Sequence, residues 1–119
     1  MKGFYQFVFF NQQHLQIRQH AVLSLHKLDL TGPAGTVRLT ATEATLLQAF
    51  AQSSDARLAF EQVAQCMGIV LSDEQKSNIQ VRMVRLRKKL HEAGAEGAVI
   101  EAIRNVGYQF FDELDIRKS

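Results

Sequence analysis

The chain has 119 residues and a net charge of +2, with 46% hydrophobic and 22% charged residues. This length predicts one domain with its own hydrophobic core, and the composition excludes a disordered chain. No apolar run reaches the ~18 residues that span a membrane, and no small-residue cleavage site follows the apolar start Met1–Phe10, so a signal peptide is not predicted.

Residues 1–39 are expected to form an N-terminal antiparallel sheet, because short apolar, aromatic and β-branched runs alternate with turn residues. The predicted strands are Phe4–Phe10, Leu15–Arg18, Val22–Lys27 and Thr36–Leu39, and Thr31–Gly35 is predicted as a turn. The first of these strands either completes the sheet or pairs across a two-fold axis to form a homodimer, and the sequence leaves both alternatives open.

Helical spacing begins after residue 39. Thr40 and Glu43 fit a capping box, in which a hydroxyl and a carboxylate satisfy backbone donors at a helix start. This first helix is expected to end at Ser53–Asp55. A second helix is predicted over about Ala59–Cys66, with Phe60, Val63 and Met67 buried and Gly68 as its terminator.

A third helix, which Ser72–Gln75 can cap, is predicted to extend to about Glu92. Its apolar residues form one stripe at 100° per residue, which predicts the buried face as Ile79, Met83, Leu86 and Leu90. The opposite face carries Ser77, Val81, Val84, Arg85 and Lys88, with Asn78, Arg82 and Lys89 on one flank and Gln80 and Arg87 on the other.

The basic residues of the chain are concentrated on this helix. Six of the 14 Lys and Arg residues lie between Lys76 and His91, where there is no Asp or Glu, and the rest of the chain has a net charge of −4. Clustering of this kind is typical of a phosphate-binding surface. Arg can bind guanine in the major groove, Asn and Gln can bind adenine, and Val can contact a thymine methyl group. A solvated helix face is the other interpretation, and the absence of acids disfavours it because such faces usually mix charges.

The C-terminal part is predicted to be a β-hairpin. Val99–Ile103 and Tyr108–Phe111 flank a turn in which Asn105 and Gly107 tolerate positive φ. Arg104 in this turn either contacts a phosphate or is an exposed residue of an ordinary edge hairpin. Tyr108 is expected to be an aromatic residue of the core or its rim and not a ligand-binding residue.

Catalytic and metal-binding signals are missing from the sequence. It has no Gly-rich phosphate loop, no metal-ligand spacing among its histidines, and no paired nucleophile, since the lone Cys66 is expected in the core. A lone cysteine also favours a reducing, cytoplasmic location. We therefore predict no enzyme, no cofactor and no metal site.

Three segments together resemble the winged-helix effector domain of OmpR/PhoB-type response regulators, which act in two-component signal transduction. These segments are Leu39–Leu47, Ile79–Leu90 and Ile103–Tyr108, and the resemblance covers about Leu23–Phe110. It implies an α+β fold, namely a winged helix-turn-helix with an N-terminal antiparallel sheet (1–39), a three-helix core (40–94) and a C-terminal hairpin wing (99–111) in one domain of residues 1–119. A receiver domain is not expected, and the chain could be a stand-alone regulator, a fragment, or the cytoplasmic part of a membrane-anchored activator.

The resemblance implies sequence-specific binding of double-stranded DNA, with the third helix in the major groove and the wing on the adjacent groove or backbone. The residues expected to read or approach bases are Asn78, Val81, Arg82, Arg85 and Lys88, and those expected to anchor phosphates are Arg87, Lys89 and Arg104. The loop before the third helix would meet RNA polymerase through Asp73 and Glu74. Glu101 and Gln109 stand where the family often has basic wing residues, which predicts weaker phosphate binding. The alternative function is a winged helix that binds a partner regulator or polymerase without reading DNA.

Overall fold

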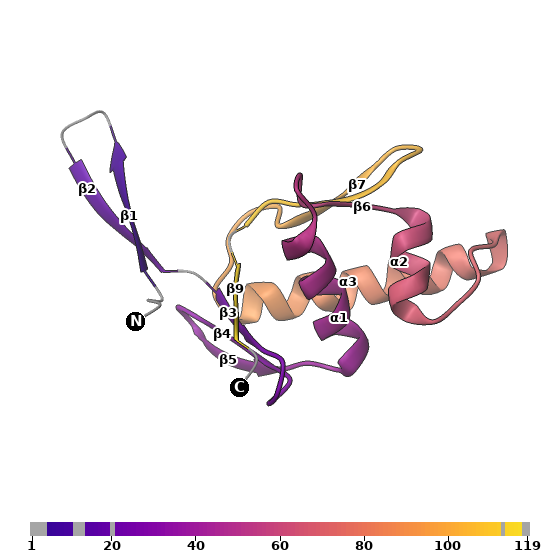
Figure 1. Cartoon of the computed structure of the whole chain (residues 1–119), viewed down its shortest axis with the longest axis horizontal. Coiled ribbons are helices and arrows are strands. Elements are labelled where there is room, and N and C mark those ends of the chain that lie inside the picture. Colours follow the sequence, from indigo (N-terminus) through magenta and orange to yellow (C-terminus); the bar gives the residue numbers. More distant parts are fainter. Residues whose placement is uncertain (1–4, 11–13, 20, 113, 118–119) are drawn as a thin grey trace.

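The computed structural model describes residues 5–10, 14–19, 21–112 and 114–117. Its helices are α1 (Ala41–Gln52), α2 (Phe60–Met67), the short 3₁₀ helix η1 (Asp73–Gln75) and α3 (Lys76–Glu92). Its strands are β1 (Tyr5–Phe10), β2 (His14–Gln19), β3 (Ala21–Ser24), β4 (Asp29–Gly32), β5 (Gly35–Arg38), β6 (Arg57–Ala59), β7 (Ile100–Ile103), β8 (Gly107–Phe110) and β9 (Leu114–Arg117). The three predicted helices and the C-terminal hairpin are therefore present in the predicted order (Figure 1).

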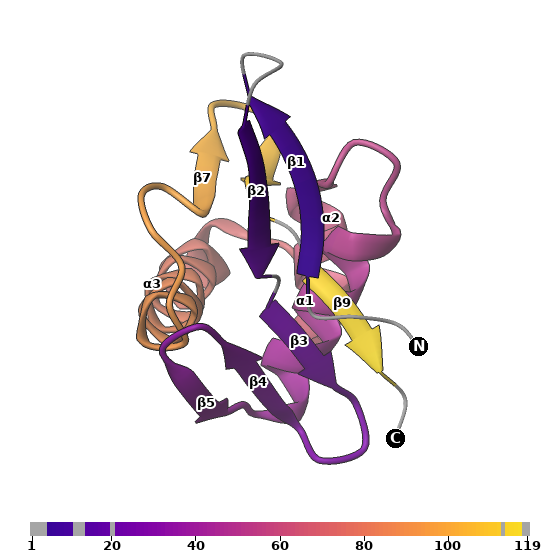
Figure 2. The same ribbon diagram turned by 90° about the vertical axis from the view of Figure 1, so that its left-hand side faces the viewer.

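The N-terminal strands form two sheets, whereas one was predicted. β1 and β2 pair with each other in a two-stranded sheet that extends away from the rest of the described chain (Figure 1). Of the two alternatives left open for the first strand, completion of the main sheet is therefore wrong within the described residues. The second sheet has the order β5-β4-β3-β9, and Figure 2 shows the C-terminal β9 alongside β3. This pairing of β3 with β9 is parallel.

Two segments of that sheet were not predicted from the sequence. β4 overlaps the expected turn Thr31–Gly35, because Thr31 and Gly32 still pair with Thr36 and Gly35 before the chain reverses. β9 alternates apolar and polar residues, but it is only four residues long, and its place in the sheet comes from pairing with β3.

The helix ends follow the predicted capping, with one exception. Thr40 caps α1 through its side chain and forms the full capping box with Glu43. Gly68 ends α2 in the left-handed conformation at φ 70°. Ser72 makes no side-chain capping bond, because η1 precedes α3 and the α-helix starts at Lys76. The predicted cap on α3 is therefore wrong.

The wing is a three-stranded sheet of order β6-β8-β7, in which the unpredicted β6 enters from the segment between α1 and α2. Asn105 adopts the predicted positive φ, 63°, at the hairpin turn. Gly107 does not; a Cβ there would collide with the backbone of Leu58 on β6. Glycine is therefore required at residue 107 for close strand approach and not for turn geometry.

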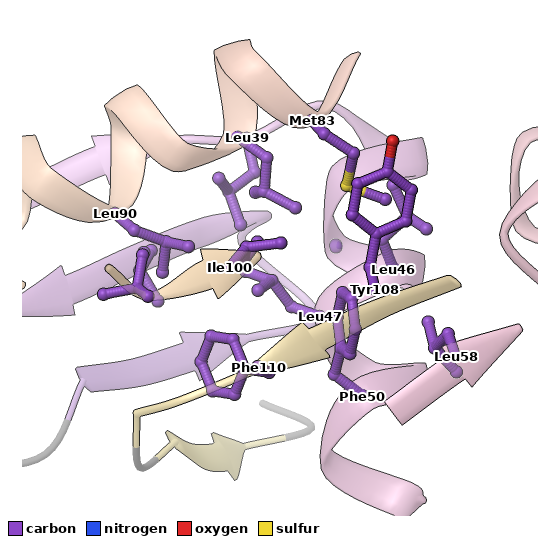
Figure 3. Close-up of a cluster of buried hydrophobic side chains, with 14 of the residues drawn as sticks. Leu39, Leu46, Leu47, Phe50, Leu58, Met83, Leu90, Ile100, Tyr108 and Phe110 are labelled. Carbon is purple, nitrogen blue, oxygen red and sulfur yellow. The ribbon is translucent and has the colours of Figure 1, made fainter. Parts of the chain in front are cut away.

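The core lies between the four-stranded sheet, the helices and the wing (Figure 3). Leu46, Leu47 and Phe50 of α1 are fully buried, and the ring of Phe50 stacks on that of Phe110 at a centroid distance of 5.7 Å. On α2 only Val63 of the three predicted core side chains is fully buried. Phe60 and Met67, like Cys66, are half-buried at the edge of the core.

Candidate nucleic-acid interface

α3 divides into a buried face and an exposed face, as its sequence periodicity predicts. The buried residues are the four predicted ones, Ile79, Met83, Leu86 and Leu90. The predicted opposite face is open to solvent over Ser77, Asn78, Gln80, Val81, Val84, Arg85 and Lys88, while Arg82, Arg87 and Lys89 on the flanks are half-buried. The core thus fixes the orientation of this helix, and its outer face carries charge and amide groups.

Basic side chains of α3 and the first residues of α1 line an open groove of about 420 Å³. Its lining comprises Thr40, Glu43, Arg82, Arg85, Lys88, Lys89 and Glu92. Within the described part of the chain, no ion pair engages Arg85 or Lys88. The amino-terminal end of α1 adds its helix dipole to this positive region. The groove can therefore attract anionic groups of a ligand.

Lys89 lies in the same groove but is bound to the protein itself. Its Nζ lies 2.6 Å from Oε1 of Glu43, and the same carboxylate oxygen accepts a 2.8 Å hydrogen bond from the backbone N–H of Thr40. Glu43 is only 4% exposed. Lys89 therefore links α3 to the capping box of α1, so its expected role as a phosphate anchor competes with an internal ion pair.

Arg87 also has an internal partner. Its Nε donates a 2.8 Å hydrogen bond to the carbonyl of Ile100, which joins α3 to the wing strand β7. Nearby, Tyr108 is 4% exposed and packs edge-to-face on Phe60 at a centroid distance of 5.8 Å. Burial raises the pKa of Tyr108, and the positive charge of Arg87 opposes this rise. Tyr108 is thus a core residue in this structure.

Arg104 is exposed at the turn of the wing. Gln109 connects the wing to the segment between α1 and α2. The Gln109 side chain accepts a 2.9 Å bond from Nε of Arg57 and donates a 2.7 Å bond to the carbonyl of Asp55. Gln109, which stands where the family often has a basic residue, therefore stabilises the wing. The sequence did not suggest this role, because Arg57 is distant from Gln109 in the chain. Arg57 itself is an exposed wing cation that sequence reasoning missed, since β6 was not predicted.

A second groove, of about 410 Å³, separates the start of α3 from the wing turn. Its lining comprises Phe60, Leu71, Lys76, Ile79, Gln80, Asn105 and Tyr108. Gln80 was assigned to a helix flank but not to the binding residues, and the structure places it facing the wing in this groove. The acids Asp73 and Glu74 are exposed on η1, at the end of α3 beside this groove, and Asp73 forms a 3.1 Å ion pair with Lys76.

Within residues 5–10, 14–19, 21–112 and 114–117, no group of His, Cys, Asp and Glu side chains could hold a metal ion. In the same residues no helix has the length and apolar character needed to cross a bilayer.

A three-helix core whose third helix is basic and exposed on one face, with a β-hairpin beside it, defines a winged-helix domain of the OmpR/PhoB effector class. The family described as "Transcriptional regulatory protein, C terminal" matches residues 34–110, which is more than half of the chain. The chain belongs to this family, whose members are transcription regulators of the DNA-binding winged-helix class.

The fold is also similar to a solved structure, "Crystal structure of the DNA binding domain of CpxR from E. coli". The two chains are 23% identical, and the superposition has a TM-score of 0.62 over 82% of this chain and 90% of that chain. This likeness confirms the predicted α+β winged-helix fold. No curated protein sequence matches the chain significantly.

Proposed function

We propose that this protein regulates transcription in the cytoplasm by reading a specific double-stranded DNA sequence with α3. The observation that carries the proposal is the exposed outer face of α3, where Arg85 and Lys88 have no ion pair within the described residues while the opposite face is locked into the core. A helix with one free polar face fits the width of the B-DNA major groove.

The proposed DNA-binding side chains have different roles, according to their surroundings in the structure. Asn78, Val81, Arg82, Arg85 and Lys88 read or approach bases, and Arg104 at the wing turn anchors a phosphate of the adjacent groove. Asn78 donates a 2.7 Å bond to Gln75, which leaves its carbonyl oxygen free to accept from a base. Arg87 and Lys89 act mainly by positioning α3 against the wing and α1, and contact phosphates only as a secondary role.

The test is a salt titration of binding, with a site selected from random duplexes compared with an unselected duplex. We expect log affinity to fall linearly with log salt for both duplexes, because phosphate contacts release counterions. Arg85→Ala should lose about 1–3 kcal/mol on the selected site only, as expected for one base contact.

Lys27→Ala is the matched control, because Lys27 is an exposed cation in the turn after β3. It should bind both duplexes like the wild type. Absence of binding at low salt would contradict the proposal and favour a protein-interaction module, which the excess of acids outside α3 and the exposed Glu101 motivate.

Two protein partners are proposed alongside DNA. Asp73 and Glu74, exposed on η1, offer an acidic surface to RNA polymerase. The β1–β2 hairpin offers a surface to a second copy of the chain, because an isolated two-stranded hairpin is marginally stable in water.

A further inference from the structure

The outer face of α3 carries two apolar side chains among its cations. Val81 is 47% exposed and Val84 is 57% exposed, and neither belongs to the hydrophobic core or to the partly buried residues packed against it. Residues three apart on a helix are surface neighbours, so the two valines form one apolar patch. Arg85 follows this patch directly on the exposed face.

This patch contributes little to the fold. Valine is a poorer helix former than alanine, and an exposed valine gains no burial. The edges of the base pairs in the major groove offer one apolar group, the C5 methyl of thymine. We infer that Val81 and Val84 contact the methyl groups of two thymines, so that the preferred half-site contains A·T pairs next to the base read by Arg85. This inference rests on the proposed function and specifies its DNA ligand.

The spacing of the two valines limits where those thymines lie. Three residues advance about 4.5 Å along a helix axis, and successive bases of one strand are about 3.4 Å apart. Because these lengths are similar, the two methyl groups belong to adjacent base pairs or to pairs separated by one step. An Arg85–guanine contact is expected beside them, since Arg85 lies four residues after Val81 and is therefore its neighbour on the exposed face.

The experiment removes the methyl groups from the DNA one at a time. A preferred site is first selected from a random duplex pool with the full chain, and each thymine in it is then replaced by deoxyuridine. This replacement deletes the C5 methyl and keeps the base-pairing groups. At two thymines we expect affinity to fall roughly fourfold, as for the loss of one buried methyl group. At the other thymines the change should be within error.

Variants then assign each methyl group to a valine. Val84→Ala should abolish the deoxyuridine effect at one position, and Val81→Ala should abolish it at the other. Alanine favours the helix, so these variants should remain folded, and circular dichroism of the unfolding transition checks this. Val70→Ala is the matched control, because Val70 is 83% exposed in the loop between α2 and η1; it should keep both deoxyuridine effects.

The outcomes separate this inference from the proposed function. Tight binding that is indifferent to deoxyuridine at every position overturns the valine contacts and leaves the DNA-binding proposal intact. A deoxyuridine effect that persists in both valine variants also overturns them, because another residue then contacts the methyl groups. If no duplex is selected and none binds at low salt, both the inference and the proposed function fail.

Discussion

At the scale of single residues, the adjacent lysines 88 and 89 have different surroundings. Lys88 is exposed and has no ion pair within the described residues, whereas Lys89 is bound to the buried carboxylate of Glu43. Helical periodicity predicted which face each lysine occupies. It could not predict the ion pair, because Glu43 is 46 residues away and its burial depends on how α1 packs against α3.

This difference gives opposite expectations for two matched variants. Lys89→Met leaves the Glu43 carboxylate buried without its cation, so we expect the free energy of unfolding to fall by about 1–3 kcal/mol. This estimate is below that for a fully buried pair, because the Lys89 side chain is 28% exposed. Lys88→Met should change stability by less than about 0.5 kcal/mol and should weaken DNA binding.

Urea unfolding and a DNA titration of both variants provide the measurements. Adding Glu43→Gln to Lys89→Met should recover part of the lost stability, since the unpaired charge is then removed. Equal stability of the two single variants would contradict the role assigned to the ion pair.

At the scale of secondary-structure elements, the helices were predictable and part of the sheets was not. The strict apolar stripe of α3 and the capping box of α1 are local signals, and both are present in the structure. β6 and β9 are only three and four residues long, too short for a distinct local pattern. Each is a short segment that becomes a strand by pairing with a partner far away in the chain, β8 and β3 respectively. The wing-stabilising bonds of Gln109 could not be predicted for the same reason, because they depend on β6.

The close approach of β6 to β8 predicts that any side chain at residue 107 lowers the stability of the wing. A methyl group there would meet the Leu58 carbonyl, so Gly107→Ala should force the two strands apart. Overpacking of this kind costs about 1–3 kcal/mol of the free energy of unfolding, measured by urea denaturation.

Val106→Ala is the control, because Val106 is the neighbouring residue in the same turn and is exposed. It should change the free energy of unfolding by no more than about 0.5 kcal/mol. A fully stable Gly107→Ala variant would mean that the wing sheet tolerates a wider spacing than the structure shows.

At the scale of the whole molecule, β1 and β2 pair only with each other among the described residues. Alternate residues of a strand share a face, so Tyr5, Phe7 and Phe9 lie together on one side. The register pairs Phe7 with Ile17 and Phe9 with Leu15, so the apolar positions of the two strands match along the sequence.

This arrangement predicts a homodimer through the apolar face of the hairpin. Phe7→Ser and Phe9→Ser should each shift the full chain toward monomer in sedimentation velocity at micromolar concentration. Val8→Ser is the matched control, since residue 8 is on the other face of the same strand, opposite Gln16. A wild-type chain that sediments as a monomer, or a Val8→Ser variant that dissociates equally, would contradict this assignment.

The parallel pairing of β3 with β9 has a consequence for synthesis on the ribosome. Ala21–Ser24 leave the exit tunnel long before Leu114–Arg117, so the nascent chain carries β3 with one edge unpaired until the last strand emerges. The three helices precede β9 in the chain and can assemble while this edge is open, whereas the wing strands β7 and β8 emerge only shortly before β9. During that interval the open edge of β3 can pair with a neighbouring polypeptide, and the emergence of β9 closes it.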